Sequence, residues 1–200
     1  TKTDECNTKY AQGGISAVWN HNIDDFSKHI ADTLDAGDDL CNPNIVKIVV
    51  EEGPKRVQEL IDWGTQFDKD NDESKYDLAR EGGHSENRIL HYRDLTGAEI
   101  ERALIEKVKS YSNVTILEHY FAIDLLTQHH LGYNVTRIMP DIECYGAYLL
   151  DLKSLDVETH LAKLTVLATG GAGQIYRATT NPIVATGDGI AMMYRAKGWV

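Results

Sequence analysis

Apolar residues recur at helical spacing near the start of the chain. Residues 23–36 carry them at positions i, i+4 and i+8, which places them on one helix face. The spacing predicts a helix over residues 23–36, with Gly37 at the C′ position, where glycine is common. The apolar face of this helix consists of Phe26, Ile30 and Leu34.

A second helical pattern follows and is interrupted by glycine and proline. Asn42 and Pro43 match an N-cap followed by proline at the first helical position. Because Gly53 and Pro54 are adjacent, we predict that this helix ends near Gly53 and that Pro54 begins another. Gly64 then closes the last of these helices.

The middle of the chain combines a polar segment with a helix. Residues 65–79 are polar, with DKDNDESK at their centre, and predict a solvated loop. Thr96 and Glu99 match the capping box T-x-x-E, which predicts that a helix begins there. The apolar face of that helix consists of Ile100, Ala103, Leu104 and Val108.

The second half of the chain carries strand patterns. Short apolar runs at residues 114–118, 122–127 and 144–152 predict strands, and residues 160–171 end in a further one. Residues 128–143 form an excursion without a strong pattern.

Residues 186–198, TGDGIAMMYRAKG, predict a final helix with Gly198 as its stop. Helices and strands are therefore interspersed along the chain, without internal repeats, which predicts the α/β class. A length of 200 residues, 42% of them apolar, suits one domain with a proper core, alone or with an appendage.

Charge and cysteine content exclude several classes of function. A net charge of −11 argues against a nucleic-acid or anionic-membrane surface. No apolar run approaches the roughly 18 residues that span a bilayer, and no signal peptide is visible. Three widely spaced cysteines without a C-x-x-C motif argue against a disulfide framework or a metal site and favour the reducing cytoplasm. They are Cys6, Cys41 and Cys144.

Two glycine-rich segments could approach a ligand with their backbone. The predicted strand at residues 164–168 runs into Thr169, Gly170 and Gly171, as at the ligand-binding edge of α/β sheets. A plain strand-to-loop turn is the alternative, because only half of a G-x-G-x-x-G pattern is present. Residues 7–18, NTKYAQGGISAV, could likewise expose backbone N–H groups, or form an ordinary glycine turn.

Two further segments carry charged groups beside glycines. Asp188 lies between two glycines near the start of the last helix and could cap it or hold a ligand hydroxyl. In REGGHS, residues 80–85, the paired glycines make a helix improbable, so charged residues crowd one bend. A surface salt-bridge cluster is the alternative reading of this bend. The charged residues at the bend are Arg80, Glu81, His84, Arg88 and His91.

These segments together resemble the L-aspartate oxidase family of the succinate dehydrogenase/fumarate reductase flavoprotein group. YAQGG, REGGHS with RILH and DLTG behind it, ATGG, and TTNP followed by TGDGIAM stand in the family's order and at similar spacing. ATGG and TGDG occur across the group, whereas REGGHS followed by RILH resembles the aspartate oxidase branch. The resemblance covers nearly the whole chain except the excursion at residues 128–160.

The resemblance implies a non-covalent FAD, because residues 6–10 lack the histidine through which covalent members attach flavin. It also implies that Glu81 faces the substrate ammonium and that His84 helps to balance its charge, so both are candidate catalytic residues. The implied FAD-binding residues are Asn7, Thr8, Tyr10, Ala11, Gln12, Gly13, Gly14, Phe121, Ala122, Thr169, Gly170, Gly171 and Asp188.

The implied fold is part of a Rossmann-like FAD-binding domain of the glutathione-reductase type, lacking its first βαβ unit. We expect residues 1–200 to be an incomplete FAD-binding domain, with the capping and C-terminal helical domains also absent. Alone, the chain should neither oxidise aspartate nor hold FAD tightly, and it should associate with a second copy.

The implied reaction is oxidation of L-aspartate to iminoaspartate in NAD biosynthesis, with oxygen or fumarate as electron acceptor. The product could pass to quinolinate synthase, and the expected location is cytoplasmic. A fumarate reductase or succinate dehydrogenase flavoprotein is the alternative enzyme. An isolated nucleotide-binding or interaction module is the alternative outside enzymes.

Overall fold

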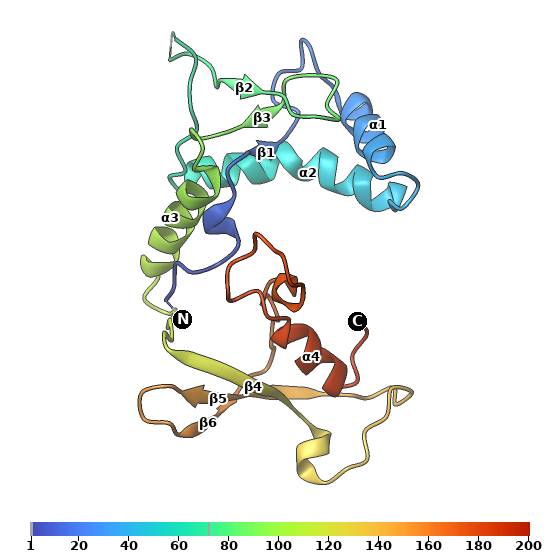
Figure 1. The fold of residues 1–200 in the computed structure, drawn as a ribbon, viewed down its shortest axis with the longest axis vertical. Helices are drawn as coiled ribbons and strands as arrows, with labels where there is room; N and C mark the ends of the chain where they lie inside the picture. The colour runs from blue at the N-terminus through green and yellow to red at the C-terminus, as the bar shows by residue number, and fades with distance from the viewer. Residues whose placement is uncertain (1, 72) are drawn as a thin grey trace. The chain divides into compact units, whose positions relative to one another are not determined.

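The computed structural model describes residues 2–71 and 73–200. The chain divides into two compact units, residues 8–114 and residues 115–200 together with residues 1–7. Both units mix helices with small antiparallel sheets, which confirms the α/β class (Figure 1).

The unit of residues 8–114 has a small three-stranded sheet in the order β1-β3-β2, packed with helices around one core. The core cluster of buried residues is Ala17, Val57, Phe67 and Leu90. The strands are β1 (Ile15–Ser16), β2 (Leu78–Ala79) and β3 (Ile89–Leu90). The helices are the 3₁₀ helix η1 (Thr8–Tyr10), α1 (Phe26–Ala36), α2 (Pro43–Asp62) and α3 (Thr96–Lys109).

The predicted first helix is confirmed as α1, although Gly37 has a different role from the one expected. Gly37 is the C-cap, with φ of −82°, so it does not take the left-handed conformation of a C′ glycine. A Cβ at this position would lie 2.1 Å from the Cys41 Sγ. Glycine at this position therefore leaves room for the Cys41 side chain.

The predicted break at Gly53 is wrong, because α2 is continuous from Pro43 to Asp62 with Pro54 inside it. Asn42 caps its start as predicted, accepting from the Asn44 and Ile45 N–H groups at 3.1 and 3.4 Å. Val50 and Val57 are buried on either side of the proline. Their spacing of seven places both on one helix face, so packing holds the helix together across Pro54.

The predicted solvated loop at residues 65–79 is only partly correct. Phe67 belongs to the core, Lys69 pairs with Tyr76 in an isolated bridge, and the last two residues form β2. Asp72, within this predicted loop, lies outside the described residues.

The predicted capping box at α3 is also wrong, although the helix itself is confirmed. Leu95 is the N-cap and makes no side-chain capping bond. The Thr96 hydroxyl instead donates to the Gly13 carbonyl at 2.8 Å, and Glu99 accepts from the Gln66 N–H at 2.8 Å. Both side chains therefore make tertiary contacts rather than capping the helix.

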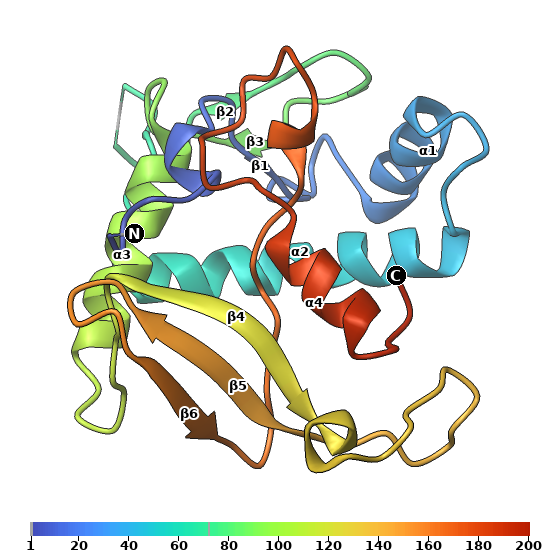
Figure 2. The ribbon, with the colours of Figure 1, turned by 60° about the horizontal axis from the view of Figure 1, so that its bottom comes forward.

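The second unit is built on the antiparallel sheet β4-β5-β6 (Figure 2). Its strands are β4 (Tyr120–Thr127), β5 (Cys144–Asp151) and β6 (Val157–Leu161). Helix α4 (Asp188–Arg195) packs on β4, where Arg195 donates to the Asp124 carboxylate at 3.0 Å and the Ile123 carbonyl at 3.1 Å. Two short 3₁₀ helices complete the unit, η2 (Gln128–Leu131) and η3 (Gly173–Ile175).

Two predicted strands are not formed. Residues 114–118 and 164–168 have no strand pairing among the described residues. Their apolar side chains remain accessible, with Val166 74% exposed. A strand exists only through hydrogen bonds to a neighbour, and these apolar runs lack that neighbour.

Candidate functional site

A cleft of about 430 Å³ in the unit of residues 8–114 brings predicted site residues together. Gln12 and Gly13 come from the segment predicted to bind the cofactor, and Glu81 comes from the REGGHS bend. Five further lining residues come from β2 or from β3 and the turn after it. The full lining is Gln12, Gly13, Ala79, Glu81, Ile89, His91, Arg93 and Asp94.

The Glu81 carboxylate lies directly against Gly13. A Cβ built on Gly13 would stand 2.6 Å from the Glu81 Oε1, closer than real side chains approach. The Gly13 carbonyl is held from the other direction by the buried Thr96 hydroxyl at 2.8 Å. Glycine at position 13 therefore leaves room for the exposed carboxylate of Glu81.

The two neighbouring glycines should respond differently to alanine. In Gly13→Ala the clash is with the end of a flexible side chain, so Glu81 moves aside and stability changes by less than about 1 kcal/mol. In Gly14→Ala the new Cβ meets the Ile89 Cγ2 at 2.3 Å and the Leu90 carbonyl at 2.5 Å. Backbone has to shift there, so we expect a loss of about 1–3 kcal/mol, measured by urea unfolding. Equal losses in the two variants would contradict this assignment.

Helix α3 holds the segment before the cleft. The Gly97 N–H donates to the Ala11 carbonyl at 2.9 Å. A Cβ on Gly97 would lie 1.7 Å from the Thr8 carbonyl, so η1 rests directly on the start of α3. Thr8, Tyr10 and Ala11 are thereby fixed in the same unit as Gln12 and Gly13, whereas Asn7 belongs to the other unit.

His91 and Arg93 line the cleft, although the sequence assigned neither a binding role. Asp68 orders both residues: its Oδ2 lies 3.2 Å from the His91 Nδ1 and accepts from the Arg93 backbone N–H at 2.6 Å. Arg93 has a φ of 48°, which is uncommon for a residue with a side chain. The sequence signal for these two residues was the segment RILHYR, which begins two residues after the REGGHS bend.

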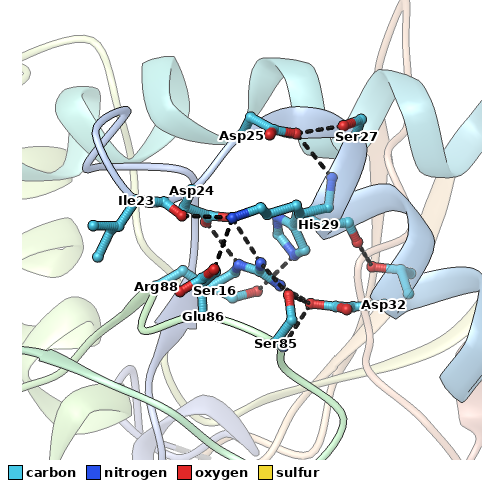
Figure 3. A network of polar contacts seen from close by, with 12 residues as sticks. Ser16, Ile23, Asp24, Asp25, Ser27, His29, Asp32, Ser85, Glu86 and Arg88 are labelled. Atoms are coloured by element: carbon cyan, nitrogen blue, oxygen red, sulfur yellow. Dashed lines mark hydrogen bonds and ion pairs between the residues drawn. The ribbon is translucent and has the colours of Figure 1, made fainter.

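Arg88 does not share the cleft with Glu81 but turns inward to α1 (Figure 3). Its fully buried guanidinium donates to both oxygens of the Asp24 carboxylate at 2.7 and 2.8 Å and also binds Asp32. Burial alone would lower the pKa of Arg88, but these carboxylates raise it. The predicted crowding of charges at one bend is therefore wrong for Arg88, which is buried in the unit.

His84, predicted as a catalytic residue, packs edge-on against His29 with ring centroids 6.1 Å apart. It is not among the residues that line the cleft with Glu81. The Nδ1 atoms of both rings are buried without a hydrogen-bond partner in the described part of the chain. A catalytic role for His84 stays a prediction.

The His29 ring should make the protein sensitive to acid. Burial, and then the charge of Arg88, lower the pKa of His29 despite the opposing effect of Asp24 and Asp32. The unfolded chain therefore binds this proton more readily than the folded protein does. The free energy of unfolding that depends on a neutral His29 is therefore complete above about pH 6.5. It is lost as the pH falls below that value, because the unfolded chain then binds the proton.

Thermal unfolding of the complete protein at pH 8 and pH 5.5 measures this effect. The loss of Tm between the two pH values should be smaller in His29→Phe, which cannot protonate, than in the wild type. His21→Phe is the control, because a general effect of removing one histidine would appear there too. An unchanged pH dependence in His29→Phe would refute the assignment.

The second group of predicted cofactor residues meets in the other unit. The Gly187 N–H donates to the Gly171 carbonyl at 3.1 Å, and a Cβ on Gly189 would lie 1.7 Å from the Thr169 Oγ1. Asp188 does not cap α4, because Gly187 is the N-cap and Asp188 is the first helical residue. Its exposed carboxylate accepts from the Thr186 hydroxyl.

Phe121 and Ala122 lie on β4, opposite Leu150 and Leu149 of β5. Phe121 is 45% exposed and Ala122 is half-buried. Gly170 takes a left-handed φ of 72°, and neither it nor Gly171 has an atom within 4 Å of the place where a Cβ would stand. The backbone of this glycine pair is therefore open to a ligand.

Comparison with known proteins places the chain among flavoproteins. The sequence profile of the family described as "FAD binding domain" matches residues 1–200. L-aspartate oxidases are similar over most of the chain: the chloroplastic enzyme of Arabidopsis thaliana is 49% identical over 96% of this chain and 28% of its own length. The enzyme of Ralstonia nicotianae is 47% identical over 94% of the chain and 34% of its own length.

Solved structures show a similar fold. A Mycobacterium smegmatis Sdh1 in complex with UQ1 superimposes with a TM-score of 0.86 at 27% identity, covering 98% of this chain and 33% of the other. A quinol-fumarate reductase with menaquinol gives a TM-score of 0.84 at 26% identity, covering 96% and 31%. The chain thus spans about a third of the length of these proteins. No helix in the described part of the chain is both long and apolar enough to cross a membrane.

Proposed function

The chain belongs to the FAD-binding domain family, and on that premise we propose that the protein oxidises L-aspartate to iminoaspartate, with FAD as its cofactor. The observation that carries this proposal is the exposed Glu81 carboxylate in the cleft, against the Gly13 backbone. Aspartate differs from the dicarboxylate succinate by its ammonium group, and a carboxylate is the group that pairs with an ammonium. The similarity to L-aspartate oxidases at 47–49% identity supports the same substrate.

The residues present fit a long cofactor that is held largely by backbone. Glycines leave the chain accessible at Gly13, Gly170 and Gly171, and at Gly13 a Cβ would fill the space beside Glu81. The residues predicted to hold FAD are exposed except for the half-buried Ala122. They remain as proposed from the sequence: Asn7, Thr8, Tyr10, Ala11, Gln12, Gly13, Gly14, Phe121, Ala122, Thr169, Gly170, Gly171 and Asp188.

FAD, when bound, supplies a two-electron acceptor whose oxidised form oxygen or fumarate restores. The chain's own contribution is to bind and orient the substrate. Glu81 pairs with the ammonium, and the adjoining His91 and Arg93 add hydrogen-bond donors to the same cleft. Oriented binding of this kind lowers the barrier by positioning the reacting carbon.

The experiment that tests this function is a turnover assay of the complete purified protein. L-aspartate with oxygen should give hydrogen peroxide, and L-aspartate with fumarate should give succinate. The structural similarity to Sdh1 and quinol-fumarate reductase favours a succinate dehydrogenase or fumarate reductase as the second candidate. Oxidation of succinate but not aspartate would establish that candidate, and FAD binding without turnover would indicate a binding module.

We also propose that FAD is not covalently attached, since residues 6–10 contain no histidine. Flavin fluorescence should leave with the supernatant when the complete protein is precipitated with acid. Flavin that remains in the pellet would contradict the proposal.

Further proposals concern partners and location. The product would pass to a quinolinate synthase, residues 1–200 alone would associate with a second copy, and the protein would reside in the cytoplasm. Two of the relatives are named as chloroplastic, so fractionation of the source cells is the relevant measurement. Recovery in an organelle would contradict the cytoplasmic location.

A further inference from the structure

The loop that carries Glu81 is anchored to α1 through Ser85. Asp32 on α1 accepts from both the backbone N–H and the hydroxyl of Ser85 at 2.8 Å each, and from the guanidinium of Arg88 (Figure 3). Burial opposes the charge of Asp32, but the Ser85 and Arg88 donors lower its pKa to about 2. Asp32 is therefore charged over the whole physiological range.

Between Ser85 and Glu81, His84 packs on His29, but the two glycines give the chain no side-chain contacts. A Cβ on Gly82 would meet nothing within 4 Å, and Gly83 has a left-handed φ of 85°. The two ends of this stretch are joined by one turn, in which the His84 N–H donates to the Glu81 carbonyl at 3.2 Å. Because Ser85 directly follows His84, anchoring Ser85 also restrains the backbone of Glu81.

Asp32 can be separated from the buried ion pair. Even without Asp32, Arg88 donates two hydrogen bonds to Asp24, which is 3% exposed. The Asp32 side chain is 16% exposed and lies at the edge of the network. Removing Asp32 therefore leaves Arg88 with its buried partner and frees mainly the loop.

We propose that Asp32 is a positioning residue for substrate selection: by anchoring Ser85, it keeps the Glu81 carboxylate against Gly13, where the carboxylate meets the ammonium of the substrate. This inference rests on the proposed function. It assigns to α1, outside the cleft, a part in distinguishing amino-dicarboxylates from plain dicarboxylates. Within the described chain, none of the hydrogen bonds of Asp32 is made to a residue that lines the cleft.

The test compares two ligands in the complete protein with FAD bound. Asp32→Ala should raise the KM for aspartate about tenfold, because the carboxylate is no longer held in place. The inhibition constant of succinate, which lacks the ammonium, should change less than about twofold. Asp35→Ala is the matched control, since it removes an exposed carboxylate from the same helix and should change neither value.

Ser85→Ala is a second, milder variant that leaves the α1 charge in place. It should raise the KM for aspartate by about threefold, and adding it to Asp32→Ala should produce no further increase, because both act through one contact. Equal changes for aspartate and succinate, or additive effects of the two variants, would overturn the proposal. If Glu81→Gln lowers aspartate turnover selectively and the Asp32 and Ser85 variants do not, the positioning role fails and the proposed function stands. If Glu81→Gln has no selective effect either, the assignment of Glu81 fails.

Discussion

Replacing Arg88 by alanine should lower the free energy of unfolding by about 3–5 kcal/mol, because breaking a buried ion pair leaves one charge without its partner. Arg88 is fully buried, and its guanidinium binds both oxygens of Asp24 at 2.7 and 2.8 Å. Asp24 is itself buried, so the variant leaves a carboxylate away from water. Urea unfolding of the wild type and the variant measures the difference.

The double variant Arg88→Met with Asp24→Leu is the control for this prediction. It removes both fully buried charges and keeps apolar side chains in the same space, while the partly exposed Asp32 keeps its two donors from Ser85. Since apolar residues can replace a buried ion pair at little net cost, it should recover about half or more of the lost stability. An Arg88→Ala variant within about 1 kcal/mol of the wild type would show that water reaches the site.

The sequence predicted helices better than it predicted their ends. Helices α1, α3 and α4 follow their apolar spacing, which is a local property of the chain. The break at Pro54 was wrong because burial of Val50 and Val57 outweighs the loss of one backbone hydrogen bond. The local sequence pattern shows that a proline disfavours a continuous helix. It does not show how much stability the surrounding core contributes to that helix.

A predicted strand forms only where a partner strand is present. Residues 122–127 and 144–152 pair with each other and form β4 and β5. Residues 114–118 and 164–168 are as apolar, yet they pair with no strand among the described residues. Strand pairing is not local, so an apolar run predicts the tendency to form a strand and not its neighbour.

At the site, the motif order led to Glu81, Gly13 and the glycines near Asp188, and the structure brings several of these together within each unit. The burial of Arg88 could not be predicted. Nothing in REGGHSENR distinguishes an arginine that faces a cleft from one that pairs with Asp24, which lies 64 residues earlier in the chain. Only the tertiary fold places that carboxylate beside it.

Replacing Glu81 by glutamine should lower kcat/KM for aspartate about ten- to a hundredfold and leave fumarate reduction nearly unchanged. Losing a charge-assisted contact to the ammonium removes about 1.5–3 kcal/mol of binding, and fumarate has no ammonium to lose. Glutamine keeps the size of the side chain, so the loop and Gly13 should stay in place. Steady-state assays with aspartate, and with fumarate and an artificial reductant, measure the two activities.

Glu86→Gln provides the matched control, because Glu86 is a carboxylate of the same loop that pairs with Lys28 at 2.7 Å and does not line the cleft. It should leave both activities unchanged, since its ion pair is partly exposed and contributes little. If Glu81→Gln reduces aspartate and fumarate turnover equally, Glu81 shapes the cleft without binding the amino group. Substrate discrimination would then have to come from the other cleft residues, of which His91 and Arg93 are the next to replace.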